Sequence, residues 1–320
     1  NIIEDIKALF NENLHKLLLT LPVSGIVIFT ILPLIYMITM AFTSYSTIDD
    51  HLLIFDWVGL DNFKKIFDVS GSIGKEFWSV LGWTLVWAVL ATGLNYILGM
   101  ILAIVINRKD TKIKGFWRFC FVLSAAIPQF VSLLIMRSML QQNGAINVFL
   151  QNWGFIDSPL PFLTDATWAR ATVVIINLWV GIPYTMLTMT GILQNIPADL
   201  YEAARVDGAN AIVTFFKITL PYMIFVTTPQ LITQFVGNIN NFNVIYLLTQ
   251  DVYVTSDQLL ANSNAKEVDL LVTWLFRLTN EYYNYKMASV IGILVFIICA
   301  AFTLVTFTRT IKGDREEDFQ

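Results

Sequence analysis

Six apolar stretches, each about as long as a lipid bilayer is thick, dominate this sequence of 320 residues. A helix needs about 20 residues to cross a hydrocarbon layer of roughly 30 Å. The stretches cover residues 17–42, 78–106, 116–139, 167–193, 222–248 and 286–307. Hydrophobic residues make up 56% of the chain and charged residues only 14%, which lies outside the range of ordinary soluble domains. We therefore predict an all-α polytopic membrane protein with six transmembrane helices.

The distribution of Lys and Arg predicts the orientation of these helices, because positive residues in short loops tend to stay in the cytoplasm. The loop between the second and third helices contains Arg108, Lys109, Lys112, Lys114 and Arg118, whereas the stretch 141–166 contains no Lys or Arg. We therefore expect the first of these connections to be cytoplasmic and the second to be external. Counting outward from them places both termini in the cytoplasm.

Composition argues against several classes of function. The formal net charge of −4 leaves no basic tract that could neutralise a nucleic-acid backbone, so we expect no nucleic-acid partner. Cys120 and Cys299 both fall inside apolar stretches, and we interpret them as small buried hydrophobic residues rather than as a disulfide. His15 and His51 have no paired ligands at metal spacing, so no metal site is predicted.

The loop before the fifth helix, residues 195–221, has the features of a helix, a turn and a second helix. Pro197 is placed to open a helix, and Asp199 and Glu202 put negative charge near the positive end of that helix. Gly208 lets the chain turn, and a second helix is predicted from about Ala211 until Pro221 marks the entry to the fifth span. On physical grounds alone, this element is either a rigid lever on the cytoplasmic face or a simple interfacial elbow.

The residues of this loop carry a family resemblance. Glu202-Ala203-Ala204, Gly208, Ile218, Leu220 and Pro221 resemble the E-A-A, G, I-x-L-P motif of the permeases of binding-protein-dependent ABC importers. The resemblance implies the type I permease fold, and it implies that the loop is the coupling helix that docks on an ATPase subunit. The implied coupling residues are Glu202, Ala203, Ala204, Asp207 and Gly208. The sequence has no G-x-x-x-x-G-K-[ST] loop, so ATP and Mg are expected on partner ATPase subunits and no cofactor in this chain.

Two stripes of uncharged polar residues lie within predicted spans. Asn177, Val180, Gly181 and Tyr184 follow helical spacing in the fourth span, as do Gln234, Asn238 and Asn241 in the fifth. Such residues are costly in lipid unless they meet one another or water, so they should face a cavity or a neighbouring helix. Hydrogen bonding between helices is the plain alternative. We favour a solute site, because amides beside an aromatic ring suit a neutral polyhydroxylated ligand such as a sugar.

From about residue 57 to residue 312, the sequence resembles the larger permease subunits of maltose and maltodextrin importers. That resemblance implies a solute site at the eight positions Asn177, Val180, Gly181, Tyr184, Gln234, Gly237, Asn238 and Asn241. Gln234 and Gly237 stand where the well-known member has Ser and Phe, so the exact glycan is less certain, and another oligosaccharide is the alternative. The large external domain of some relatives is replaced here by a short loop after the first span.

The resemblance also implies a division of the chain and a set of partners. We expect a cytoplasmic amphipathic segment at 1–16, a first helix and external loop at 17–77, a permease core at 78–310 and a cytoplasmic tail at 311–320. The segment 1–16 either lies along the inner membrane surface or packs on the bundle. The expected partners are a second permease, two ATP-binding subunits, an extracytoplasmic sugar-binding protein, the oligosaccharide and the bilayer of a bacterial cytoplasmic membrane.

Two rival functions remain at this point. A secondary transporter or channel lacks support, because no intramembrane carboxylate or histidine stands out as a site of proton or sodium coupling. A membrane enzyme is weaker still, because two isolated histidines cannot complete a catalytic triad or a metal centre. We therefore predict a non-catalytic subunit of a transport complex.

Overall fold

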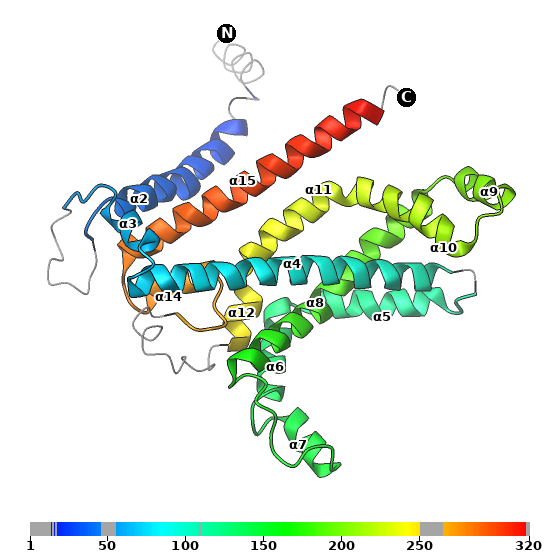
Figure 1. The fold of residues 1–320 in the computed structure, drawn as a ribbon, viewed down its shortest axis with the longest axis horizontal. Helices are drawn as coiled ribbons and strands as arrows, with labels where there is room; N and C mark the ends of the chain where they lie inside the picture. The colour runs from blue at the N-terminus through cyan, green and yellow to red at the C-terminus, as the bar shows by residue number, and fades with distance from the viewer. Residues whose placement is uncertain are drawn as a thin grey trace, which may run out of the picture.

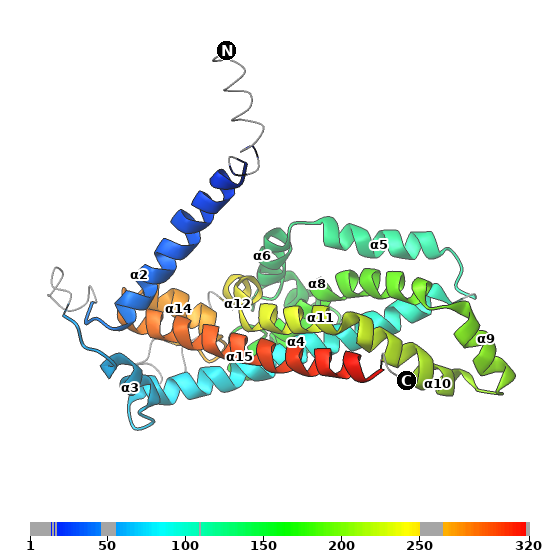
Figure 2. The ribbon, with the colours of Figure 1, turned by 90° about the horizontal axis from the view of Figure 1, so that it is seen from above.

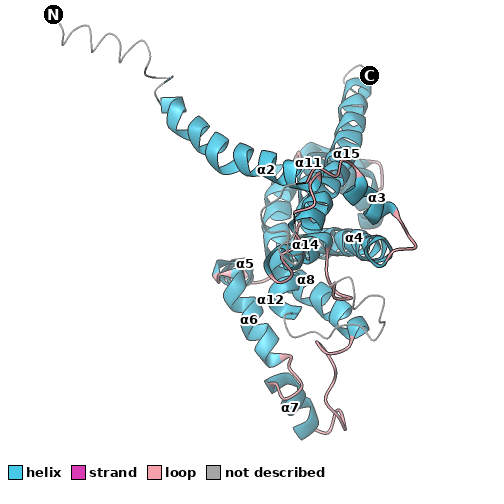
Figure 3. Cartoon of the chain, turned by 90° about the vertical axis from the view of Figure 1, so that its left-hand side faces the viewer, coloured by secondary structure: helices cyan, strands magenta, loops and turns pink. Residues whose placement is uncertain are grey.

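The computed structural model describes residues 14, 16, 18–45, 56–108, 110–249 and 265–317, the stretch 309–317 by its backbone. Throughout these residues the chain is helical, and its single β-type contact is an isolated bridge between Thr43 and Trp57 (Figures 1 and 3). The elements are η1 (Val27–Ile31), α2 (Leu32–Ala41), α3 (Asp61–Phe67), α4 (Ser72–Asn107), α5 (Lys114–Ala126), α6 (Gln129–Met139), α7 (Ala145–Asn152), α8 (Ala166–Asn195), α9 (Ala198–Val206), α10 (Ala211–Thr214), η2 (Phe215–Thr219), α11 (Leu220–Ile239), α12 (Phe242–Thr249), α14 (Leu271–Asn280) and α15 (Tyr285–Glu317).

Five predicted spans correspond to long apolar helical segments of the structure. These segments are Leu18–Ala41, Ser72–Asn107, Ala166–Asn195, Ala211–Thr249 and Tyr285–Thr308. The prediction of an all-α polytopic membrane protein is therefore confirmed. The last helix, α15, continues well beyond the predicted end of the sixth span at residue 307.

The predicted third span is not one helix. It is divided into α5 and α6, which meet at an angle of 88°. Ile127 is extended, with φ −73° and ψ 130°, and Pro128 follows it directly. Proline has no N–H to donate and disfavours the helical conformation of the residue before it, so the helix has to end there despite the continuous apolar sequence.

The core is organised around α4, which crosses the molecule and packs against α8 on one side and α11 on another (Figures 1 and 2). Helices α4 and α8 approach closely where each has a glycine. A Cβ atom on Gly99 would lie 2.6 Å from the side chain of Thr185, and one on Gly181 would lie 2.6 Å from the amide of Asn95. Each helix therefore has a glycine where the other helix has a side chain, and this lets the two helices pack closely.

The first span lies at the edge of the molecule. Its helix α2 packs along α15, and Figure 2 shows that it extends away from the other helices. Most of the predicted segment 1–16 lies outside the described residues, as do 46–55 of the first loop and 250–264 of the loop before α14.

Candidate translocation site and coupling segment

The predicted helix, turn and helix are present before the fifth span. Pro197 is the N-cap of α9, and Gly208 turns the chain with φ +74°, a conformation that side chains other than glycine rarely adopt. Asn210 then caps α10, because its side-chain oxygen accepts a hydrogen bond from the N–H of Val213 at 2.9 Å. We call residues 197–219 the coupling segment. The local prediction for this loop is confirmed.

The coupling segment joins the fifth span in a way that the sequence did not suggest. The second helix was predicted to end near Pro221, but α10, η2 and α11 form one continuous helical rod. Pro221 cannot donate a backbone hydrogen bond, and the turn before it is a π-helix in which the N–H of Leu220 bonds to the oxygen of Phe215. The wider turn accommodates the proline without ending the helix. One uninterrupted helix therefore joins the end of the coupling segment to α11.

The predicted coupling residues form an exposed surface. Glu202, Ala203, Asp207 and Gly208 are exposed, and Ala204 is buried. The hydroxyl groups of Tyr201 and Thr219 are 3.0 Å apart and tie α9 to η2. The side of α9 that carries Glu202 is therefore free to contact another protein, while its other side is fixed to the base of α11.

The coupling segment and the basic loop lie at the same end of the molecule. Figure 1 shows α9 and the turn between α4 and α5 at one end of the long axis, with α3 and α14 at the opposite end. The two connections that were predicted to be cytoplasmic are thus found together. Of the connections predicted to be external, those with α3 and α14 lie at the opposite end of the molecule, and the one with α7 lies along its lower edge.

The structure brings together three of the eight predicted solute residues. The Nδ2 atom of Asn241 lies 3.5 Å from Oδ1 of Asn177 and 3.5 Å from Oδ1 of Asn238, and Asn238 Nδ2 donates to Thr92 Oγ1 at 3.0 Å. Trp87 Nε1 donates to the backbone oxygen of Asn238 at 3.0 Å. Asn241 therefore links Asn177 on α8 to Asn238 on α11, and Asn238 in turn contacts Thr92 on α4. Asn177 and Asn238 are 95% and 92% buried, and in this conformation both take part in hydrogen bonds between helices.

The sequence reasoning missed the polar residues of α4. Asn95 is 98% buried, its Nδ2 donates to the oxygen of Ala91 at 2.8 Å, and its amide fills the space above Gly181. Asn95 Oδ1 and Asn177 Nδ2 are buried without a hydrogen-bond partner among the described residues. A polar atom left in this way costs about 1–3 kcal/mol. The signal was available, because Thr92 and Asn95 are three residues apart within an apolar span.

The comparison with protein families agrees with this geometry. Residues 95–312 match the family described as the binding-protein-dependent transport system inner membrane component. The chain belongs to this family. It is therefore the membrane component of such a transport system, and it is not the subunit that hydrolyses ATP.

Curated relatives of this permease transport oligosaccharides, as their names state. It is 38% identical over 295 residues to the galactooligosaccharides transport system permease protein GanP of Bacillus subtilis, with 91% of this chain and 69% of GanP covered. It is 34% identical over 310 residues to the maltodextrin transport system permease protein MdxF of the same organism, with 94% and 70% covered. It is 36% identical over 257 residues to the maltose/maltodextrin permease protein MalF of Klebsiella aerogenes, covering 79% of this chain and 49% of MalF.

A solved structure confirms the type I permease fold. One chain of a bacterial ABC transporter involved in the import of the acidic polysaccharide alginate matches with a TM-score of 0.73 and 21% sequence identity, and the match covers 96% of this permease and 99% of that chain. At this level of identity the match establishes the fold of the permease.

The remaining predicted solute residues form no described side-chain hydrogen bond with the three asparagines. Tyr184 is 56% exposed, and its hydroxyl donates to the backbone oxygen of Ala125 on α5 at 2.9 Å. Val180 and Gln234 are half-buried, and Gly237 has no heavy atom within 4 Å of the Cβ position. These residues and Asn241 provide the accessible part of the two stripes.

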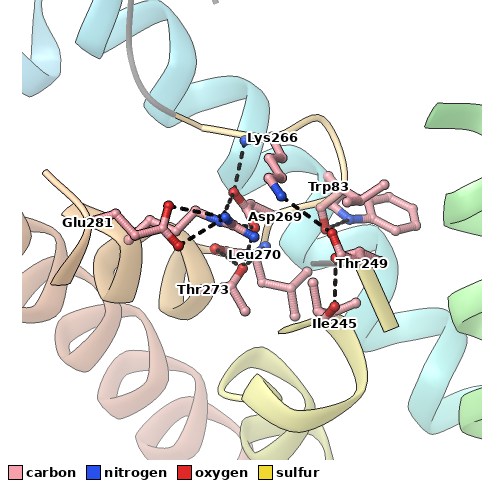
Figure 4. A network of polar contacts seen from close by, with 10 residues as sticks. Trp83, Ile245, Thr249, Lys266, Asp269, Leu270, Thr273 and Glu281 are labelled. Carbon is pink, nitrogen blue, oxygen red and sulfur yellow. Dashed lines mark hydrogen bonds and ion pairs between the residues drawn. The ribbon is translucent and has the colours of Figure 1, made fainter. Parts of the chain in front are cut away.

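A second polar centre joins α14 to the residues that directly precede it (Figure 4). It lies at the end of the molecule opposite the coupling segment (Figure 1). Asp269, which is fully buried, pairs with Arg277 at 3.1 Å and accepts bonds from the backbone N–H of Lys266 at 2.8 Å and from Thr273 Oγ1 at 3.0 Å. Arg277 also pairs with Glu281 at 3.2 Å. Burial raises the pKa of the Asp269 carboxyl, and Arg277 opposes that rise. We call these residues the α14 ion-pair cluster.

Cysteine and metal chemistry contribute nothing to the described site. Both cysteines are free, but only Cys299 is buried, so the prediction that both are buried is wrong for Cys120, which is exposed on α5. Because α5 packs against α8 and α4 on one side only, the other side remains open. Within the described ranges, no group of three His, Cys, Asp or Glu side chains could hold a metal ion.

Proposed function

We propose that this chain is one of two permease subunits of an ATP-driven oligosaccharide importer, coupled to two ATP-binding subunits that hold ATP and Mg. The observation that carries the proposal is the coupling segment, which presents Glu202 on an exposed helix and continues without a break into α11. Closure of the ATP-binding subunits would push the coupling residues Glu202, Ala203, Ala204, Asp207 and Gly208, and the rod would transmit that movement to the polar stripe on the same helix.

The orientation of the chain in the membrane follows from the position of the coupling segment. The coupling segment must face the ATPase subunits, so its end of the molecule, both termini and the basic loop are assigned to the cytoplasm. The opposite end, with α3 and α14, is assigned to the side of an extracytoplasmic sugar-binding protein. A solved structure of the same fold is a bacterial alginate ABC transporter in complex with an alginate pentasaccharide-bound periplasmic protein, which supports a partner of that class.

The proposed solute site comprises the eight stripe residues Asn177, Val180, Gly181, Tyr184, Gln234, Gly237, Asn238 and Asn241. Neutral amides and a phenol donate to and accept from sugar hydroxyls, and the site has no charged side chain that would select an ion. The unpartnered Nδ2 atom of Asn177 supports the same interpretation, because it can donate to a hydroxyl group. Maltodextrin is the first candidate, on the names of MdxF and MalF. A galactooligosaccharide is the second, on the higher identity to GanP.

Reconstitution tests the proposed function. The chain is placed in proteoliposomes alone and together with its second permease, its ATP-binding subunits and the loaded binding protein. We expect ATP-dependent uptake of a maltodextrin or galactooligosaccharide only in the complete assembly. Uptake by the chain alone, driven by a proton or sodium gradient, would instead establish a secondary transporter.

The Tyr184→Ala substitution tests the solute site in the complete assembly. We expect uptake to fall by about tenfold, which corresponds to the loss of about 1.4 kcal/mol of solute binding, while assembly is unchanged. The matched control is Tyr36→Ala on α2, which removes the same side chain at a closely similar exposure, 57% against 56%. Equal uptake by the two variants would place the solute elsewhere.

A further inference from the structure

A cluster of cations surrounds the turn between α4 and α5. It consists of Arg108 and Lys112 in the turn and Lys114 and Arg118 in the first turns of α5, and we call it the inner basic cluster. The chain as a whole carries a net charge of −4, so this local excess of positive charge is opposite in sign to the net charge of the protein. Positive residues near this position are enough to orient the chain in the membrane. Orientation does not require that hydrogen bonds fix their side chains.

Two of the four cations are hydrogen-bonded to Asn107, the last residue of α4. Lys114 Nζ donates to the backbone oxygen of Asn107 at 3.2 Å, and Arg118 donates to the side-chain oxygen of the same residue. Asn107 is in turn bonded to Thr190 on α8 at 3.1 Å. None of the four forms an ion pair with a carboxylate in the part of the chain that the structure describes. Their charges are therefore available to an anion from outside the chain.

An apolar surface continues directly from this cluster along α5. Phe116, Phe119 and Leu123 share one face of the helix by their spacing and are 53%, 59% and 53% exposed. No residue of α5 is buried, and Trp117 beside them is 48% exposed. Trp is enriched where a bilayer meets water, which suits the exposed position of Trp117. Cations at the end of an exposed apolar helix match a molecule with an anionic head and a hydrocarbon tail.

We propose that the inner basic cluster binds the phosphate of an anionic phospholipid, with an acyl chain lying along Phe116, Phe119 and Leu123. Charge complementarity selects an anionic headgroup over a zwitterionic one. The continuous apolar face selects a lipid over a soluble phosphate. The coupling segment is a separate surface with its own acidic residues Asp199, Glu202 and Asp207, so this site does not depend on the proposed transport function.

The test compares the thermal stability of the full-length chain in nanodiscs of phosphatidylcholine with that in an equal mixture of phosphatidylcholine and phosphatidylglycerol. The site variant is Arg108→Gln/Lys112→Gln, because both side chains are exposed and neither makes a described side-chain hydrogen bond. The control is Lys65→Gln/Lys75→Gln, which removes two exposed positive charges near α3 at the other end of the molecule. Both variants therefore remove two exposed positive charges, at opposite ends of the molecule.

We expect phosphatidylglycerol to raise the Tm of the native chain by about 4 °C. The site variant should lose at least half of that increase, and the control should keep it. Native mass spectrometry should show phosphatidylglycerol retained by the native chain and the control, and depleted in the site variant. An equal increase in both variants would overturn the proposal. Reproduction of the effect by inorganic phosphate in phosphatidylcholine nanodiscs would overturn it too, and would assign the cluster to a soluble anion.

Discussion

Substitution of Gly208 by proline is expected to reduce ATP-dependent uptake by at least tenfold while the protein still inserts into the membrane. Gly208 has φ +74°, whereas proline fixes φ near −65° and cannot donate the bond that Gly208 N–H now makes to the oxygen of Arg205 at 3.1 Å. The turn must therefore change shape, and the exposed face of α9 is displaced from the rod that leads into α11. Basal ATPase activity should remain, and its stimulation by loaded binding protein should be lost.

The chain offers a closely matched control for this experiment. Gly154 has φ +70°, its N–H donates to Gln151 at 3.0 Å, and like Gly208 it has no heavy atom near the Cβ position. It follows α7, away from the coupling segment (Figure 1). Gly154→Pro should introduce comparable local strain but leave uptake within about twofold of the native value. Full stimulation of ATPase in Gly208→Pro, or equal loss of uptake in the two variants, would show that the segment is not the coupling element.

The coupling segment was predictable because its local signals agree with one another. Pro197 begins α9, Gly208 adopts the conformation that only glycine adopts easily, and Asn210 caps the next helix, so each residue alone favours the observed structure. The end of the segment was not predictable in the same way. Proline normally ends a helix, whereas here a π-turn precedes Leu220-Pro221, as another precedes Leu32-Pro33, and the helical rod continues.

The bend between α5 and α6 shows a limit of hydropathy. Averaged over a bilayer-length window, residues 116–139 are continuously apolar, and this average conceals the effect of Pro128 on the backbone of Ile127. The five spans that are continuous helices in the structure gave the same hydropathy signal. A rule that ended helices at every proline would have failed at Pro183, which lies inside α8.

The solute site was predictable as two stripes, but not as an arrangement in space. Spacing placed Asn177 on one face of the fourth span and Asn238 and Asn241 on one face of the fifth, and these three residues do meet, although Asn241 lies between α11 and α12. Which third helix they meet depends on tertiary packing. The close approach of α4 through Gly99 and Gly181 brings Thr92 to Asn238 and Asn95 to Gly181, and no local pattern reports that approach.

The α14 ion-pair cluster was not recognised from the sequence, although Asp269, Thr273, Arg277 and Glu281 follow one another at intervals of four residues. Its removal should have the largest effect on stability. Asp269→Leu is expected to lower the stability of the folded chain by about 3–5 kcal/mol, because the guanidinium of Arg277 stays buried, cannot lose its proton and keeps only the partly exposed Glu281 as an ion-pair partner. Thermal unfolding in detergent measures the change. The control is Asp61→Leu, which breaks the solvent-exposed pair with Lys64 and should leave the stability nearly unchanged. The double variant Asp269→Leu/Arg277→Met should recover much of the loss, since no buried charge remains without its partner.

Arg277→Met alone should behave differently from Asp269→Leu, because a carboxyl can accept a proton and a guanidinium cannot give one up. Burial already raises the pKa of Asp269, and loss of the opposing Arg277 charge raises it further above the unfolded value of about 3.9. The folded state then holds the proton more tightly than the unfolded state, so stability is greatest in acid and falls as pH rises above about 4, until the folded-state pKa is passed. Unfolding of both single variants across this pH range checks the prediction. Equal pH dependence in the two would show that Asp269 is not the group responsible.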